Sequence, residues 1–267
     1  MRELTIDDID GPWFVRAGSN GLIFDMHMHI ENAAALGWTM SAQDCIRAMD
    51  DAGVQSAAVM TLTDLPGLNP DGLELIAQAC GSYPGRLYGF LRLNPAHLQV
   101  SKDLLTRAVG QLDFRGLKLH PVSTLQHPGG APTIDLVRHA GTLGVPTLFH
   151  CGDEPLSTPL AVAQTAAACP DSTIVLGHMG GYFHVDEAID VAEQYPNVVL
   201  ETSAMPYPDK ILLAVDRLGA DRVMFGSDGP VSSPVLERQK VVLAALGQDR
   251  ADLVLGGNAQ RLLGLAA

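Results

Sequence analysis

The chain is organised around one segment, Phe24-Asp25-Met26-His27-Met28-His29, which follows the residues Gly21-Leu22-Ile23. The β-branched and aromatic content of this run predicts the end of a buried strand. Side chains alternate between the two faces of a strand, so we expect Asp25 and both histidines on one face and both methionines on the other. Two imidazoles on one face can bind a single metal ion, and Asp25 is placed to orient a ring or the neighbouring backbone.

A pair of histidines two residues apart is weak evidence for a metal site when it stands alone, because most such pairs are solvated or structural. The rest of the chain strengthens the interpretation of this pair as part of a metal site. Apolar, strand-like segments recur, and each is followed by a segment with helical periodicity. The expected strand ends lie at His29, Leu62, Asn94, His120, His150, His178, Ser203 and Asp228.

Eight such units in about 250 residues imply a parallel sheet that is covered by helices and closed into a barrel. We therefore predict an α/β fold, a single (β/α)8 TIM barrel over residues 21–267, with a short N-terminal extension over 1–20. Two closing helices are expected over 235–246 and 258–263. After the first strand, the strands are expected at 54–62, 87–93, 114–120, 145–150, 173–178, 198–202 and 222–228.

The connection after the first strand, residues 31–40, is expected to be a loop of small residues. Ser41 follows it, with Asp44 three residues further on, which is the pattern of a helix N-cap. The helix that begins there is expected to end near Gly53.

Composition restricts the class of partner. The 267 residues are 47% hydrophobic and 18% charged, with a net charge of -13 and a pI near 4.9. Because there is no basic patch to neutralise phosphates, the sequence argues against nucleic acid or an anionic membrane and favours a small-molecule substrate. No signal-peptide core or membrane-length apolar run is present. The four cysteines are scattered, so we expect reduced thiols and a soluble, cytoplasmic protein, with a homo-oligomer left open.

Polar side chains stand at nearly every expected strand end. They are His27 and His29, Arg92 and Asn94, Lys118 and His120, His150, His178, Glu201 and Asp228. In a barrel of this kind the catalytic groups lie at the carboxyl ends of the strands, on one face. Buried polar pairs would account for two or three such positions, but not for this series of metal-ligand and acid–base types. The series predicts an active site.

These residues resemble the amidohydrolase superfamily, and within it the amidohydrolase-2 branch, which includes hydrolases and enzymes of the aminocarboxymuconate-semialdehyde decarboxylase type. Short sequence motifs show this resemblance from about residue 21 to the end of the chain, and their order and spacing together are specific. They are Phe24-Asp25-Met26-His27-Met28-His29, Gly116-Leu117-Lys118-Leu119-His120-Pro121, Leu176-Gly177-His178-Met179-Gly180-Gly181, Tyr195-Pro196-Asn197-Val198, Phe225-Gly226-Ser227-Asp228-Gly229-Pro230 and Gly257-Asn258-Ala259-Gln260-Arg261-Leu262-Leu263.

The resemblance implies one divalent metal ion, held by His27, His29, His150 and Asp228 with water completing the shell. Zinc is the expected ion, because imidazole and carboxylate ligands suit it and an open coordination position is typical of catalytic sites. The ion would lower the pKa of its water to roughly 7. Asp228 is expected to ligate the ion and to accept the water proton. His178 is expected to orient water or substrate and to act as an acid or base.

Three further residues are candidates for substrate binding. Arg92 and Lys118 are candidate cations for a substrate carboxylate, with a core ion pair to Glu201 as an equally weighted alternative. His120 is expected to form a wall of the pocket rather than to ligate the ion. Lys118 also leaves open a binuclear site, in which a carbamylated lysine bridges two metal ions.

Two enzymatic functions and one non-enzymatic function fit these residues. The first is a metal-dependent hydrolase that uses activated water on a small amide, cyclic amide, lactone or ester. The alternative is a metal-dependent, non-oxidative decarboxylase of a small carboxylic acid, aromatic acids included. The third, a silent metal-binding or scaffold protein, is disfavoured because every residue needed for chemistry is present.

Overall fold

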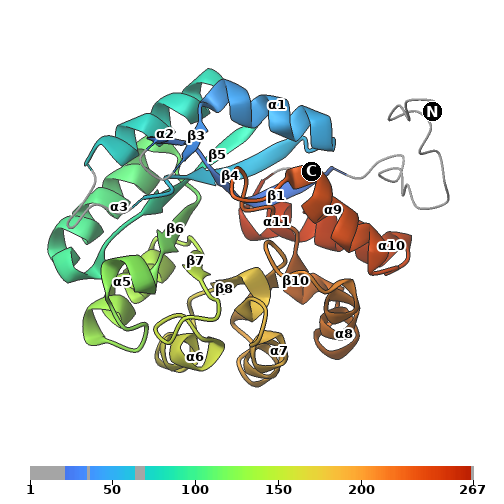
Figure 1. The fold of residues 1–267 in the computed structure, drawn as a ribbon. Helices are drawn as coiled ribbons and strands as arrows, with labels where there is room; N and C mark the ends of the chain where they lie inside the picture. The colour runs from blue at the N-terminus through green and yellow to red at the C-terminus, as the bar shows by residue number, and fades with distance from the viewer. Residues whose placement is uncertain (1–21, 35–36, 64–69, 266–267) are drawn as a thin grey trace.

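Eight parallel strands form the centre of the fold in the computed structural model, which describes residues 22–34, 37–63 and 70–265 (Figure 1). The sheet order is β1-β4-β5-β6-β7-β8-β9-β10. The strands are β1 (Phe24–His29), β4 (Ser56–Met60), β5 (Leu87–Arg92), β6 (Gly116–Leu119), β7 (Thr147–His150), β8 (Ile174–Gly177), β9 (Val198–Glu201) and β10 (Val223–Met224). Each lies within its predicted range. The predicted extension over 1–20 falls outside the described residues.

The first and last strands close the barrel. Met26 N donates to Phe225 O at 3.0 Å, and Asp228 N donates to His27 O at 2.7 Å. The last strand was predicted over 222–228, but its regular part is only β10. Beyond it the chain bonds to β1 and reaches Asp228, whose φ of 59° is incompatible with an extended strand. The predicted TIM barrel is confirmed.

Helices form an outer ring around the strands (Figure 1). The long ones are α1 (Ala42–Ala52), α2 (Pro70–Ser82), α3 (Leu98–Leu112), α5 (Ala131–Thr142), α6 (Pro159–Ala168), α7 (Val185–Gln194), α8 (Pro208–Leu218) and α9 (Pro234–Leu243). Shorter turns are η3 (Pro95–His97), α4 (Pro121–Thr124), η4 (His178–Gly180), η5 (Ala220–Arg222), α10 (Gln248–Asp252), the π-helical η6 (Leu253–Gly257) and α11 (Asn258–Leu262). The two predicted closing helices correspond to α9 and α11.

The apolar core has two parts. The larger part lies between the strands and the ring of helices, and the smaller part fills the barrel interior. The interior part contains Phe24, Met26, Ala58, Met60, Phe90, Leu148, Val175, Met224, Ala259 and Leu263. Its last two members come from the C-terminal segment around α11, which therefore packs against the barrel interior. Because apolar side chains fill the barrel interior, the polar side chains gather at the carboxyl ends of the strands.

Strand β1 contains an irregularity that corrects the predicted faces. Asp25 pairs with Ala57 and Met28 pairs with Val59, so three steps along β1 match two steps along β4. Such an extra residue is a β-bulge, which re-aims the side chains that follow it. Met26 packs inside the barrel, whereas Met28 packs outside it, against the helices. The prediction that the two methionines share one face was therefore wrong, because strict alternation fails at the bulge.

Asp25 links the bulge in β1 to the segment that follows β10. Its Oδ1 accepts hydrogen bonds from His27 N at 3.0 Å and from Ser227 N at 2.9 Å. Burial raises the pKa of Asp25 to about 8, while these hydrogen bonds act in the opposite direction. The predicted role in orienting the neighbouring backbone agrees with these contacts.

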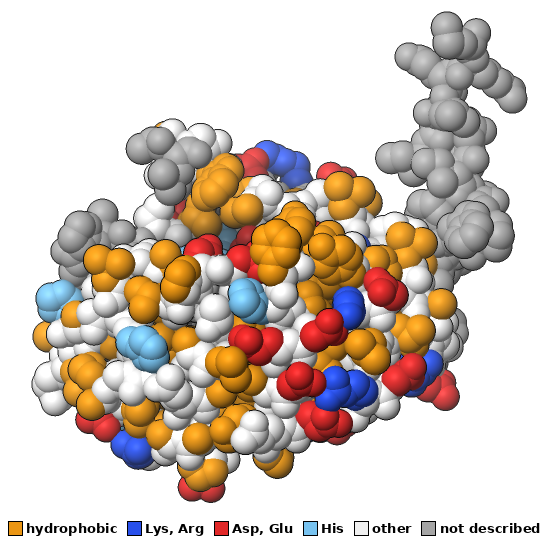
Figure 2. Space-filling model, turned by 60° about the horizontal axis from the view of Figure 1, so that its bottom comes forward, with side chains coloured by type: hydrophobic (Ala, Val, Ile, Leu, Met, Phe, Trp, Pro, Cys, Tyr) orange, Lys and Arg blue, Asp and Glu red, His pale blue; other side chains and the backbone are white. Residues whose placement is uncertain are grey.

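Basic side chains on the outer helices lie beside acidic ones. Figure 2 views the side of the molecule that carries α6, α7 and α8, where apolar, acidic and basic side chains are intermingled. Lys210 Nζ lies 2.6 Å from Asp186, and Arg217 lies 2.9 Å from Asp190. None of the helices in the described part of the chain combines the length and apolar character that a membrane span needs.

The segment predicted to be a loop after β1 contains a short antiparallel hairpin, β2 (Glu31–Ala33) and β3 (Trp38–Met40). The loop prediction was wrong because this pairing depends on tertiary support rather than on strand propensity. Both Oε atoms of Glu31 are used: one accepts from the backbone N–H groups of Leu62 and Thr63 at 2.7 Å, the other from Thr63 Oγ1 at 2.5 Å. The hairpin is thereby tied to the loop after β4.

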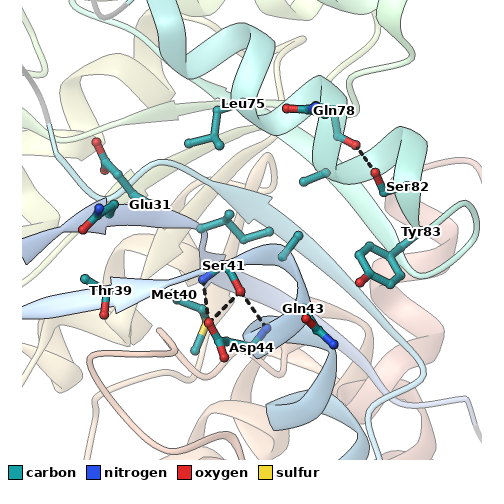
Figure 3. A pocket seen from close by; sticks show the side chains of 14 residues that line it. Glu31, Thr39, Met40, Ser41, Gln43, Asp44, Leu75, Gln78, Ser82 and Tyr83 are labelled. Atoms are coloured by element: carbon teal, nitrogen blue, oxygen red, sulfur yellow. Dashed lines mark hydrogen bonds between the residues drawn. The ribbon is translucent and has the colours of Figure 1, made fainter.

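The helix that follows the hairpin begins as predicted. Ser41 Oγ accepts from Asp44 N at 3.1 Å, and Asp44 Oδ2 accepts from Ser41 N at 3.1 Å, which completes a capping box (Figure 3). Gly53 ends the helix in the left-handed conformation, with φ 68°.

We expect Gly116→Ala to destabilise the barrel. A Cβ at this position would lie 2.1 Å from the ring of Phe90, a fully buried side chain of the interior core. Overpacking of this kind costs about 1–3 kcal/mol. Denaturant unfolding measures the loss. The matched control is Gly110→Ala in α3, where an added Cβ meets nothing within 4 Å. Equal stability of both variants would contradict the packing described for the interior.

Candidate metal centre and active site

Three side chains from the two ends of the chain meet at the carboxyl face of the barrel. His29 Nε2 lies 3.0 Å from Asp228 Oδ1, and His27 Nε2 lies 3.5 Å from the same oxygen. Each residue is buried, and the ligand atoms of the three lie within 4.8 Å of one another. This grouping can surround a single ion.

The hydrogen-bond partners of Nδ1 in His27 and His29 determine which ring nitrogen faces Asp228. His29 Nδ1 lies 3.0 Å from the carbonyl oxygen of Thr61, which only accepts, so the proton is on Nδ1. His27 Nδ1 lies 2.9 Å from Glu201 Oε2 and donates to it. When these rings are neutral, each Nε2 directs its lone pair toward the carboxylate of Asp228. A cation between the lone pairs and the carboxylate oxygen would stabilise this arrangement, so the donor set fits a metal ion.

Lys118 reaches the same centre from β6. Its side chain is 1% exposed, and Nζ lies 2.7 Å from His27 Nε2. An ammonium group only donates, so Nε2 accepts here, which agrees with a proton on Nδ1 of the same ring. Glu201, the alternative partner considered for Lys118, accepts from His27 and from Ser203 Oγ at 2.8 Å. Lys118 therefore places positive charge beside the three candidate ligands.

Glu201 orients His27 from a fully buried position at the end of β9. Burial raises its pKa, and contacts with His178 and Ser203 act in the opposite direction. Gly226 leaves the space that this carboxylate fills, because an added Cβ would lie 2.2 Å from Glu201 Oε1. A carboxylate behind a ligating histidine fixes the orientation and tautomer of the ring.

His150, the predicted fourth ligand, lies in the same cavity but outside the group of three. Its Nδ1 is 3.1 Å from His178 Nε2, and its Nε2 is 3.3 Å from Glu154 Oε2. Its ring stacks on His120, with centroids 3.9 Å apart and planes 6° apart. His178 in turn stacks on His27, with centroids 5.0 Å apart. The structure therefore pairs His150 with His178, and its role as a ligand stays a prediction.

Burial and nearby charges set the protonation states in the cavity. Burial lowers the pKa of His178 to about 4, and it also lowers the pKa of His27 and of His120. For Asp228, burial alone would raise the pKa, but His27, His29 and His178 outweigh it and hold the pKa well below its usual range. These shifts favour unprotonated rings for His27 and His178 and an ionised carboxylate for Asp228, and metal ions bind neutral imidazole and carboxylate.

A cavity of about 370 Å³ opens onto these groups. Every residue predicted for the site lines it: His27, His29, Arg92, Lys118, His120, His150, His178 and Asp228. Trp38, Leu62 and Val231 contribute apolar surface. The cavity therefore joins a polar centre to an apolar wall that comes partly from the β2–β3 hairpin.

Arg92 and His120 occupy the β5 and β6 side of this cavity. Arg92 donates to Ser123 Oγ at 3.1 Å and to Thr61 O at 3.4 Å. His120 Nδ1 accepts from Ser123 N at 3.3 Å, which caps the short helix α4. These contacts hold the guanidinium and the ring in place at the cavity wall, and the substrate-binding roles of both residues stay predictions.

A larger cavity of about 620 Å³ lies on the other side of the hairpin, between α1 and α2 (Figure 3). Residues that line it include Glu31, Thr39, Ser41, Leu75 and Tyr83, and none of the predicted site residues is among those described there. Its size alone does not make it the reaction site. Convergent ionisable groups with shifted pKa values mark the smaller cavity instead.

Two residues of the centre have unusual backbone conformations. His178 has φ 66° and Asp228 has φ 59°, both in the left-handed region that favours glycine. Such residues cost about 1–3 kcal/mol each and persist where the surrounding structure holds them in place. Their coincidence with the cavity agrees with a functional constraint on these side chains.

Several contributors to the site were not predicted from the sequence. Ser203 was counted as a strand end but not as a site residue, and Glu154 comes four residues after His150, so polar residues at and just beyond each strand end were an available signal. Thr61 acts through its carbonyl oxygen, which no side-chain pattern encodes. Trp38 enters through the hairpin that was expected to be a loop.

Solved structures with the same fold include several decarboxylases. The 2,6-dihydroxybenzoate decarboxylase from Rhizobium superposes with a TM-score of 0.71 at 15% identity, covering 91% of this chain and 98% of that chain. The 5-carboxyvanillate decarboxylase from Sphingomonas paucimobilis gives 0.72 at 15% identity, covering 92% and 100%. A dihydroxybenzoic acid decarboxylase from Polaromonas, with bound manganese and an inhibitor, gives 0.69 at 17% identity, covering 92% and 97%.

At these identities the likeness supports the fold alone, and none of the curated protein sequences matches this chain. The family assignment comes from the sequence itself. The amidohydrolase family model matches residues 24–265, which is nearly the whole barrel and includes all of the candidate site residues. The chain therefore belongs to the amidohydrolase family, in the amidohydrolase-2 branch that its strand-end motifs predicted.

Proposed function

We propose that this chain is a metal-dependent, non-oxidative decarboxylase of a small aromatic carboxylic acid. The observation that carries the proposal is one cavity in which the candidate ligands His27, His29 and Asp228 lie beside the cations Lys118 and Arg92. The names of the similar structures favour decarboxylation over hydrolysis, since most of them are decarboxylases, including those of 2,6-dihydroxybenzoate and 5-carboxyvanillate. This reverses the order of preference that the sequence suggested.

His27, His29 and Asp228 would hold a divalent ion, with His150 as the predicted fourth ligand, and the bound ion would supply Lewis-acid charge beside the substrate carboxylate. Zinc is expected from the imidazole and carboxylate donors. Manganese is the second candidate, because three of the similar structures contain it.

Substrate binding is assigned to groups of the same cavity. Lys118 and Arg92 attract the anionic acid, and a guanidinium can pair with a carboxylate through two hydrogen bonds. Trp38, Leu62 and Val231 offer apolar surface to an aromatic ring. The volume of about 370 Å³ suits a single-ring acid better than a larger molecule.

The reaction breaks the bond between the ring carbon and the carboxyl carbon. The electron pair stays on the ring carbon and carbon dioxide leaves. The ring carbon then takes one proton, so one acid anion and one proton give one arene and one carbon dioxide. We assign the transfer of that proton to Asp228 and His178. Because burial lowers the pKa of His178, a proton on its ring is readily passed on.

Hydrolysis of a small amide, cyclic amide, lactone or ester is the second candidate. It is supported by the position of Asp228 in the cavity, where nearby histidines hold the pKa of its carboxyl group well below the usual range. An ionised carboxylate at this position can take a proton from an attacking water.

The first prediction separates these reactions. With 2,6-dihydroxybenzoate and related hydroxybenzoates in D₂O, we expect carbon dioxide release and one deuterium at the ring carbon that carried the carboxyl group. Mass spectrometry of the product measures both. Asp228→Asn should lower kcat by roughly 10²–10⁴-fold with little change in KM. Turnover of a lactone and amide panel, without carbon dioxide from any acid, would favour hydrolysis instead.

The second prediction concerns the ion. Protein purified without added metal should contain about one equivalent of a divalent ion by elemental analysis. His29→Ala should lose most of it, because His29 Nε2 faces Asp228 directly. His97→Ala is the control, since this exposed histidine lies at the start of α3. Near-zero metal with unaltered activity in chelator would refute the metal site, and two equivalents would indicate the binuclear site with Lys118.

The third prediction tests the cations. Arg92→Gln should raise KM for an acid substrate by about tenfold or more, and should leave binding of its neutral ester or amide nearly unchanged. Ser123→Ala removes a partner of Arg92 but keeps the charge, so it should have a much smaller effect. Inhibition constants for the acid and its ester provide the measurement. Equal losses for charged and neutral ligands would identify Arg92 as a structural residue.

A further inference from the structure

We propose that Ser203 is a positioning residue that fixes the tautomer of His178, so that the unprotonated Nε2 of this ring faces the catalytic cavity. The inference rests on the proposed function only in taking His178 as an acid–base group of the reaction. Ser203 itself is fully buried and does not line the cavity, so it acts through His178 rather than on the substrate.

The contacts of Ser203 define the direction of each hydrogen bond. Its Oγ lies 2.8 Å from Glu201 Oε2 and 2.9 Å from His178 Nδ1. A hydroxyl has one proton, and Ser203 donates it in a hydrogen bond to the Glu201 carboxylate. Oγ can therefore only accept from His178 Nδ1–H. The carbonyl oxygen of Ser203 lies 3.3 Å from the same nitrogen and can only accept. Both contacts therefore require the proton on Nδ1.

Glu201 connects this arrangement to the candidate metal ligands. Its carboxylate accepts from His27 Nδ1 at 2.9 Å and from His178 N at 3.4 Å, besides the contacts with Ser203. One buried carboxylate and one hydroxyl thus set the tautomers of two stacked rings. In both rings the proton is then on Nδ1, on the side of Glu201 and Ser203. Nε2 of His27 accepts from Lys118 Nζ at 2.7 Å, and Nε2 of His178 accepts from His150 Nδ1 at 3.1 Å.

The turn that carries Ser203 is held by helix α9. Ala204, which has φ 53°, donates its N–H to Glu237 Oε2 at 3.1 Å. Lys240 Nζ donates to Thr202 O at 3.0 Å and to Met205 O at 2.7 Å. Glu237 and Lys240 also form an ion pair, and Glu237 is only 6% exposed. The hydroxyl is therefore placed by the scaffold before any substrate arrives.

The neighbouring threonine provides a matched control. Thr202 is fully buried like Ser203, but its Oγ1 has no hydrogen-bond partner among the described residues. Thr202→Val removes this hydroxyl and conserves the shape of the side chain. Any effect that comes from disturbing the turn should appear in both variants, whereas the tautomer effect should appear only when Ser203 is changed.

The experiment compares Ser203→Ala with Thr202→Val in the full chain, labelled with ¹⁵N and loaded with diamagnetic Zn²⁺. Long-range ¹H–¹⁵N correlation spectra distinguish the two tautomers, and a His178→Asn variant identifies the signals. We expect Ser203→Ala to shift His178 from the Nδ1–H tautomer toward a mixture of the Nδ1–H and Nε2–H tautomers. The conversion should be incomplete because the carbonyl oxygen of residue 203 still accepts from Nδ1–H. We also expect kcat to fall about tenfold with KM unchanged. Thr202→Val should leave both unchanged.

A wild-type ¹⁵N pattern in Ser203→Ala would overturn the proposal, and so would an equal shift in Thr202→Val. If the alanine variant does not fold, Ser203→Cys serves the same test, because a thiol is only a weak donor and acceptor. The ¹⁵N readout needs no substrate. It therefore judges the role of Ser203 even if the protein proves to be a hydrolase.

Discussion

Closure of the barrel between its first and last strands is the constraint on which the candidate centre depends. His29 and Asp228 are 199 residues apart in the sequence, yet their Nε2 and Oδ1 atoms lie 3.0 Å apart. Asp25 ties the same two segments together through the backbone of His27 and Ser227. Because the donors come from both sides of the closure, a cation bound there also stabilises the closed barrel relative to the unfolded chain.

The position of the site follows from elementary rules. Carboxyl ends of parallel strands in a closed barrel share one face, so polar residues at these ends must lie near one another. The repeat of strand and helix patterns was enough to predict this, and all eight candidate residues line one cavity. What the pattern cannot encode is which donor faces which acceptor, as with His150 and its partners His178 and Glu154.

Three features escaped prediction for a common physical reason. The bulge in β1, the β2–β3 hairpin and the left-handed backbone of His178 are each stabilised by contacts between distant segments. Glu31, for example, supports the hairpin by binding backbone N–H groups of the next loop. Local propensity is a weak guide where tertiary contacts supply the stabilising energy. These features also lie around the cavity, where His27, Trp38 and His178 are lining residues.

The net charge of the whole chain is negative, whereas the cavity contains two cationic side chains. The chain carries a net charge of -13, which would repel an anionic substrate at long range. Surface charges are screened over a Debye length of about 8 Å at physiological ionic strength. Lys118, in contrast, is 1% exposed and is screened far less. Arg92 adds a second cation to the same cavity. Asp228 is the single carboxylate among the described lining residues, so an acid that reaches the cavity meets more positive than negative charge, and an acidic protein can still bind an acid.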